Sequence, residues 1–223
     1  MNYVSPNNSL FSIDRLFQNY EWLNAISLNN YPVLMVVWNL LLLLVPLAAA
    51  VILYRYYDRT KFRKKKQKVA AFLLFLIWIF FIPNAAYIIT DVRNLLGYCP
   101  VSSFRNVCLP NAWMIPVFFG YGLVGWIAFV LLVNQMRNFL KRIYSGEAAL
   151  LFVIILIPLI SLGVLLGLVD RFSSWAVFTQ PGNVFSALTN YFTNWIYAKN
   201  WIIFILAFYI LYFVGTEFLR QPR

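Results

Sequence analysis

Long apolar runs separated by short polar segments dominate the chain. Each run is about as long as the roughly 20 residues that an α-helix needs to cross the hydrocarbon core of a bilayer. The pattern predicts an all-α fold, a polytopic bundle of transmembrane helices that forms one integral membrane domain over residues 1–223. The five predicted spans are about 33–57, 69–90, 112–133, 148–169 and 200–217.

Two other segments have apolar residues at helical spacing but carry too many polar residues to cross a bilayer. In the first, about 10–27, the apolar stripe shares its helix with Asp14, Arg15 and Glu21. The second, about 183–197, precedes the last apolar run. This pattern is typical of amphipathic helices that lie on the membrane surface or against the bundle.

The composition agrees with a membrane protein and removes several kinds of site. Hydrophobic residues make up 62% of the chain and charged residues only 11%, whereas soluble domains have about 25% charged residues. There is no histidine and there are only two cysteines, so the usual ligands of zinc, haem and iron–sulfur centres are missing. We therefore expect no cofactor and no metal site.

The net charge of +11 predicts how the helices are oriented. Thirteen basic residues lie in 55–68, 137–142 and the C-terminal tail, on one side of the predicted bundle, and five lie on the other. Because basic residues collect on the cytoplasmic side, we expect an extracytoplasmic N-terminus and a cytoplasmic C-terminus. The basic run 55–68 should attract anionic lipid headgroups, and we expect no nucleic acid partner.

In this orientation Cys99 and Cys108 share one short extracytoplasmic loop. Oxidising conditions outside the cell favour a disulfide between them. Closing so short a loop stabilises a fold by about 2–3 kcal/mol in the chain-entropy model. Two free thiols are the alternative.

Polar residues share one face at the end of the second predicted span. Asn84, Tyr87 and Asp91 are spaced by three and four residues, so they lie on one side of a helix, with Thr90 beside them. Polar groups within a bilayer are costly and mark functional sites by default. This face is therefore a candidate site.

Pro83 interrupts the same span and removes the hydrogen bond that would reach the carbonyl group of Ile79. In lipid that carbonyl needs another partner. The side chain of Asn84 or of Asn39, in the first span, is a candidate donor.

The fourth predicted span has its own stripe, with Gly163, Gly167 and Arg171 four residues apart and Ser174 and Trp175 continuing it. Small residues allow a neighbouring helix to approach closely, so this stripe should face the bundle. Both polar faces then end at the same depth, and we predict that Asp91 and Arg171 pair or share a ligand. Equally weighted is the alternative that these residues only cap or anchor helix ends.

Two motifs in this chain resemble those of a known family. The string Phe-x-Pro-Asn-Ala-x-Tyr-x-x-Thr-Asp occupies residues 81–91. The second motif comprises Gly167, Arg171, Ser174, Trp175 and Pro181, and the spacing of Asn39 and Pro46 also matches. The chain thus resembles "domain of unknown function 1361", a family of small bacterial polytopic membrane proteins. The resemblance implies a multi-pass protein of the bacterial cell membrane but no activity.

The chain departs from the family pattern at four positions. Leu168, Ser173, Ala176 and Asn94 stand where the family tends to have arginine, asparagine, aspartate and histidine. Three of these changes remove an ionisable group, which weakens the case for a catalytic site.

Three classes of function remain, ranked in this order. The first is a binding, transport-associated or accessory subunit, with other membrane proteins as partners and Asp91 and Arg171 as charged contacts. The second is a structural assembly partner. The third is a membrane-embedded enzyme acting on a lipid or lipid-linked substrate, in which Asp91 would act as a base and Arg171 would hold a phosphate.

Overall fold

The structure, a computed structural model, confirms an all-α bundle. It describes residues 27–28, 31–92, 112–172, 174 and 176–220. The predicted surface helix 10–27 lies outside these residues except for Ser27, and so do Cys99, Cys108 and Trp175. Two antiparallel two-residue strands, β1 (Ser27–Leu28) and β2 (Tyr31–Pro32), precede the first helix.

Five helices in the described part of the chain are long and apolar enough to cross a membrane. They are α3 (Val33–Thr60), α4 (Lys65–Thr90), α5 (Met114–Ile143), α6 (Gly146–Leu168) and α9 (Trp195–Phe218). Two shorter helices, α7 (Ala176–Thr179) and α8 (Pro181–Thr193), connect α6 to α9.

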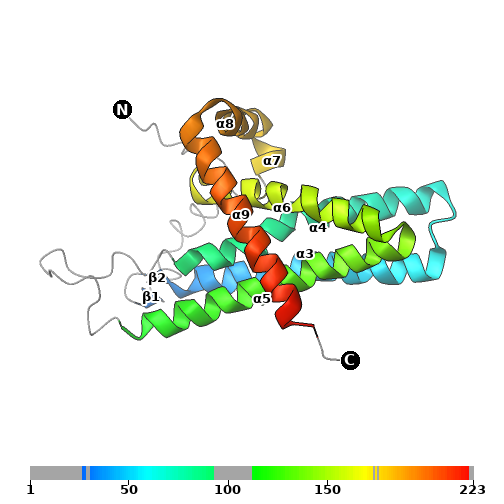
Figure 1. Cartoon of the computed structure of the whole chain (residues 1–223), viewed down its shortest axis with the longest axis horizontal. Coiled ribbons are helices and arrows are strands. Elements are labelled where there is room, and N and C mark those ends of the chain that lie inside the picture. Colours follow the sequence, from blue (N-terminus) through cyan, green and yellow to red (C-terminus); the bar gives the residue numbers. More distant parts are fainter. Residues whose placement is uncertain (1–26, 29–30, 93–111, 173, 175, 221–223) are drawn as a thin grey trace, which may run out of the picture.

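The bundle has two chemically different ends (Figure 1). Helices α3 to α6 run alongside one another, and α9 crosses them obliquely. The turns between α3 and α4 and between α5 and α6 lie at one end, which we call the basic end because residues 55–68 are there. The start of α3 and the ends of α4 and α6 lie at the other end, which we call the polar end.

Helix boundaries extend beyond several of the apolar runs. The predicted third span ends at Val133, but α5 continues to Ile143 through Asn134, Arg137 and Lys141. Polar residues such as arginine and lysine end an apolar run without breaking a helix, because their helix propensity is high.

The break before the last span also differs from the prediction. The surface helix predicted at 183–197 ends at Thr193, and α9 begins at Trp195 rather than near residue 200. Asn194 marks the break, since its side-chain oxygen accepts a hydrogen bond from the backbone N–H of Ile196 at 2.9 Å. Asparagine is one of the best helix N-caps, so its chemistry explains where α9 starts.

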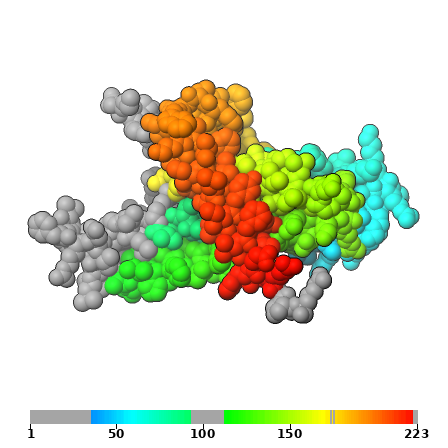
Figure 2. Space-filling model, in the orientation of Figure 1, coloured from blue at the N-terminus to red at the C-terminus, as the bar shows by residue number. Residues whose placement is uncertain are grey.

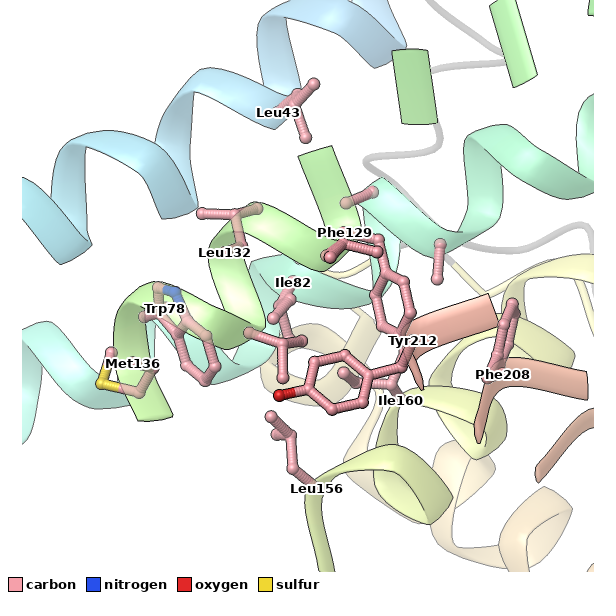
Figure 3. Packing of buried hydrophobic residues seen from close by; sticks show 14 of the residues in the cluster. Leu43, Trp78, Ile82, Phe129, Leu132, Met136, Leu156, Ile160, Phe208 and Tyr212 are labelled. Atoms are coloured by element: carbon pink, nitrogen blue, oxygen red, sulfur yellow. The ribbon is translucent and has the colours of Figure 1, made fainter. Parts of the chain in front are cut away.

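Buried apolar side chains from all five long helices form the core (Figure 3). Its labelled members are Leu43, Trp78, Ile82, Phe129, Leu132, Met136, Leu156, Ile160, Phe208 and Tyr212. Among the five long helices, α6 is the most central, because 50% of its most apolar stretch is buried inside the protein. Helix α9 is the most peripheral, with 17% of the corresponding stretch buried. Because α9 buries so little surface, other contacts must position it.

Hydrogen bonds from α9 supply those contacts on α6. Pro158 has no backbone N–H and leaves the carbonyl of Ile154 without its helical partner. The hydroxyl of Tyr209 donates to that carbonyl at 2.6 Å. The indole N–H of Trp201 donates to the carbonyl of Pro158 at 3.1 Å. Helix α9 therefore satisfies the broken turn of α6, as a membrane interior requires.

A second group of hydrogen bonds ties α9 to α5. The hydroxyl of Tyr212 donates to the side-chain oxygen of Asn134 at 2.8 Å, and the amide of Asn134 donates to Thr216 at 3.2 Å. The indole N–H of Trp126 donates to the carbonyl of Leu211 at 2.8 Å. Interhelical bonds of this kind contribute roughly 0.6 kcal/mol each in membranes, so together they help to fix the oblique crossing.

Candidate polar site at one end of the bundle

The carboxylate of Asp91, at the polar end, belongs to the most buried acidic or basic residue in the described part of the chain. It follows the last residue of α4, and its residue is only 2% exposed. Its Oδ2 accepts a hydrogen bond from the amide Nδ2 of Asn39 in α3, at 3.2 Å. A negative charge is unfavourable at a helix C-terminus, so this donor compensates part of the cost and joins α3 to α4.

A second polar contact joins α4 to the segment after α6. The amide Nδ2 of Asn84 donates to Oγ of Ser174 at 3.3 Å. These residues are 90 positions apart in the sequence, and both belong to the predicted cluster. The amides of Asn39 and Asn84 thus have acceptors other than the carbonyl of Ile79, and no described bond joins either of them to it.

The glycine stripe of α6 faces the bundle, as predicted, and it packs against α4 at Pro83 and Tyr87. A Cβ atom added at Gly163 would lie 2.9 Å from Cγ of Pro83, which is too close for any residue but glycine. A Cβ at Gly167 would lie 3.5 Å from the ring of Tyr87. The missing side chain at Gly163 therefore makes room for the proline, and the two helices meet along this line.

Thr90 closes the last turn of α4. Its hydroxyl donates to the backbone carbonyl of Tyr87 at 2.7 Å. Such a bond satisfies one of the carbonyls left free at a helix C-terminus, so the role of Thr90 here is local.

Arg171 differs from the other cluster members because it is exposed and its backbone is left-handed, with φ of 60°. The backbone N–H of Phe172 donates to the carbonyl of Leu166 at 3.0 Å across this turn. Glycine usually occupies such a position, since other residues are strained there by about 1–2 kcal/mol. Backbone strain of this kind clusters at functional sites, so Arg171 is a candidate site residue.

The predicted direct pair between Asp91 and Arg171 is not formed. Within the described residues, the ion pairs closer than 4.0 Å include no contact between them. Asp91 is instead engaged by Asn39, so a shared ligand is the part of the prediction that remains.

Asp170 has a partner that the sequence did not indicate. Its Oδ2 accepts a hydrogen bond from the hydroxyl of Tyr191 in α8 at 2.9 Å. Burial raises the pKa of the Asp170 carboxyl, while this hydrogen bond acts in the opposite direction. Burial also raises the pKa of Tyr191, with a further contribution from Asp170. The contact joins the end of α6 to α8.

The sequence predicts Asn39 only as a candidate donor to the carbonyl of Ile79, whereas the structure pairs it with Asp91. A lone amide in an apolar span is a recognisable signal, but its partner lies 52 residues away. Among the described residues no group of three or more His, Cys, Asp or Glu side chains could hold a metal ion. These described residues can therefore bind a ligand through hydrogen bonds and through the exposed guanidinium of Arg171.

A family model described as "Protein of unknown function (DUF1361)" matches residues 38–214. The chain belongs to this family. The DUF1361 match includes both motifs and the contacts of Asn39 with Asp91 and of Asn84 with Ser174. Comparison with curated proteins and with solved structures finds no match.

Proposed function

We propose that this integral membrane protein is a binding or accessory subunit whose polar end holds an anionic group, such as a lipid headgroup phosphate. The supporting observation is the contrast between Arg171 and the two carboxylates at the polar end. The side chain of Asp91 is engaged by Asn39, and that of Asp170 by Tyr191. Arg171 is exposed and has no acidic partner among the described residues.

Guanidinium groups suit phosphate and carboxylate ligands because their donors form a planar fork. Ser174 follows Arg171 in the segment after α6, and Asn84 lies on α4. These two side chains offer further hydrogen-bonding groups. The ligand would therefore meet one charged and two neutral groups at the end of α4 and α6.

The same contacts favour binding over catalysis. A general base must reach the proton that it removes, but Asp91 is 2% exposed and already hydrogen-bonded. Asp170 is also hydrogen-bonded, to Tyr191. Both carboxylates thus join helices at the polar end, Asp91 with Asn39 and Asp170 with Tyr191.

We infer the orientation from the charge distribution of the sequence, with thirteen basic residues in 55–68, 137–142 and the C-terminal tail and five elsewhere. This bias supports a basic end in the cytoplasm and a polar end outside the cell membrane. A reporter fused to residue 223 should be cytoplasmic, and a periplasmic reporter signal at that position would reverse the assignment.

Binding can be tested with purified protein in nanodiscs of phosphatidylcholine, titrated with dihexanoyl phosphatidic acid in a calorimeter. Arg171→Gln should weaken binding about tenfold or more, because charge-assisted hydrogen bonds are among the strongest. Arg171→Lys should retain part of the affinity, since it keeps the charge but not the fork.

Lys199→Gln removes an exposed cation near the start of α9, outside the proposed site. It is the matched control and should leave this affinity unchanged. Equal affinity in Arg171→Gln and wild type, or no binding by wild type, would contradict the proposal. A change in thermal stability alone would indicate the structural alternative.

A further inference from the structure

The basic end carries a dense patch of exposed positive charge that the proposed function does not use. Eight basic residues and one acid, Asp58, lie in the α3–α4 hairpin at 55–68. Seven of the eight are exposed and have no acidic partner within 4.0 Å among the described residues. These seven, the hairpin patch, are Arg55, Arg59, Arg63, Lys64, Lys65, Lys66 and Lys68.

Asp58 pairs with two basic residues that are not part of the hairpin patch. It pairs with Lys61 at 3.1 Å and with Arg142 of α5 at 2.9 Å. Arg142 also donates to the hydroxyl of Tyr54 at 2.9 Å and lies 5.3 Å from the centre of its ring. Lys61 and Arg142 thus make contacts within the protein. The residues of the hairpin patch take no part in these contacts.

Aromatic rings beneath the patch indicate its depth. Tyr57 packs edge-on against Phe62 and Phe139, with ring centres 5.1 and 5.6 Å apart. Tyrosine and other aromatic side chains collect at the membrane–water interface. Basic residues just beyond such a layer lie at the level of the lipid headgroups.

Helix length supports the same depth. Helix α3 has 28 residues, which corresponds to about 42 Å and exceeds the roughly 30 Å hydrocarbon core. The hairpin turn extends past the turn between α5 and α6 (Figures 1 and 2). The surplus length carries the charges out of the apolar layer.

The start of α4 makes this charge unfavourable for the isolated protein. Lys64 precedes the helix, Lys65, Lys66 and Lys68 follow within its first turn or so, and the first turn has no acidic residue. Cations repel the positive end of the helix dipole and one another. An external anion would relieve both repulsions.

We propose that the hairpin patch holds anionic phospholipid headgroups of the adjacent leaflet, while Lys61 and Arg142 remain paired with Asp58. Juxtamembrane basic residues attract anionic lipids strongly, and the patch lies at headgroup depth rather than far out in solvent. These observations favour lipid over an acidic protein segment as the occupant.

The test uses the full-length protein reconstituted in vesicles of equal parts phosphatidylglycerol and phosphatidylcholine. After mild detergent extraction and purification, mass spectrometry gives the ratio of the two lipids that remain bound. Wild type should retain phosphatidylglycerol in clear excess, and the excess should fall as salt rises because screening weakens exposed charges. The variant Lys64→Gln/Lys65→Gln/Lys66→Gln should reduce the excess by at least about fivefold.

Lys61→Gln is the matched control, since it removes one cation from the same hairpin but not from the patch, and it should keep the excess. Arg171→Gln should keep it too, so this result is independent of the proposed polar site. A bound ratio equal to that of the vesicles, or an excess insensitive to salt, would overturn the proposal even if the triple variant failed to fold. Retention of an added polyglutamate peptide without any lipid excess would assign the patch to a protein partner instead.

Discussion

The α3–α4 hairpin carries one carboxylate at each end, and the two are used in opposite ways. At the basic end Asp58 is exposed and pairs with two cations, Lys61 and Arg142. At the polar end Asp91 is almost fully buried and accepts a hydrogen bond from a neutral amide, Asn39. Its predicted partner, Arg171, is exposed.

This difference shows that ion pairing and structural importance need not coincide. Exposed ion pairs contribute little to stability because water screens them and long side chains must be ordered. A buried polar group contributes more to the effect of a substitution, because its partner is left unsatisfied when it is removed. The buried carboxylate of Asp91 should therefore matter more than the exposed carboxylate of Asp58.

The largest effect is expected at Asp91. Asp91→Ala should lower the free energy of unfolding by roughly 2–4 kcal/mol, because it removes a buried carboxylate and leaves the partly buried amide of Asn39 without this acceptor. Asp91→Asn should cost less, since its amide oxygen can still accept that bond. Thermal unfolding in detergent micelles measures both, and equal, small losses would break the comparison.

An intermediate effect is expected at Asp170, the second carboxylate of the polar end, and it should depend on pH. Burial raises the pKa of Asp170 in the folded protein, so the unfolded chain loses this proton first. Stability should therefore fall as pH rises from about 4, the ordinary aspartate value, through the raised pKa.

Asp170→Asn should remove this contribution while keeping an acceptor for Tyr191. Melting temperatures of the variant and wild type across this pH range provide the measurement. Parallel curves for the two proteins would contradict the assignment.

The smallest effect is expected at Asp58. Asp58→Asn removes both ion pairs of the basic end but should leave the melting temperature close to that of wild type, because the pairs are exposed. A loss as large as that of Asp91→Ala would show that the hairpin depends on Asp58 and would reverse the comparison.

Most of the fold could be predicted because each span is a long run of apolar residues that is recognisable in the sequence. The bounds were less predictable where polar residues continue a helix beyond the apolar layer, as from Asn134 to Ile143. The cap at Asn194 was hidden for a different reason, because asparagine is common in loops as well as at helix starts.

The site was predictable in its members but less so in its pairings. Helical phase placed Asn84 on the polar face, and the glycine stripe indicated which side of α6 meets it. The helical phase of a residue does not determine which distant residue its side chain will contact. The contact of Asn39 with Asp91 depends on how α3 packs against α4, and the apolar surface of α3 is too uniform to reveal that face.

The hydrogen bond from Tyr209 to the carbonyl of Ile154 has a consequence for how the protein is made. Synthesis proceeds from the N-terminus, so α6 is complete before the ribosome reaches α9. Until then the carbonyl freed by Pro158 lacks its tyrosine partner within the membrane. Helix α9 therefore supplies a hydrogen bond that α6 lacks until synthesis is nearly complete. A chain truncated before Tyr209 should be degraded by the cell's membrane proteases.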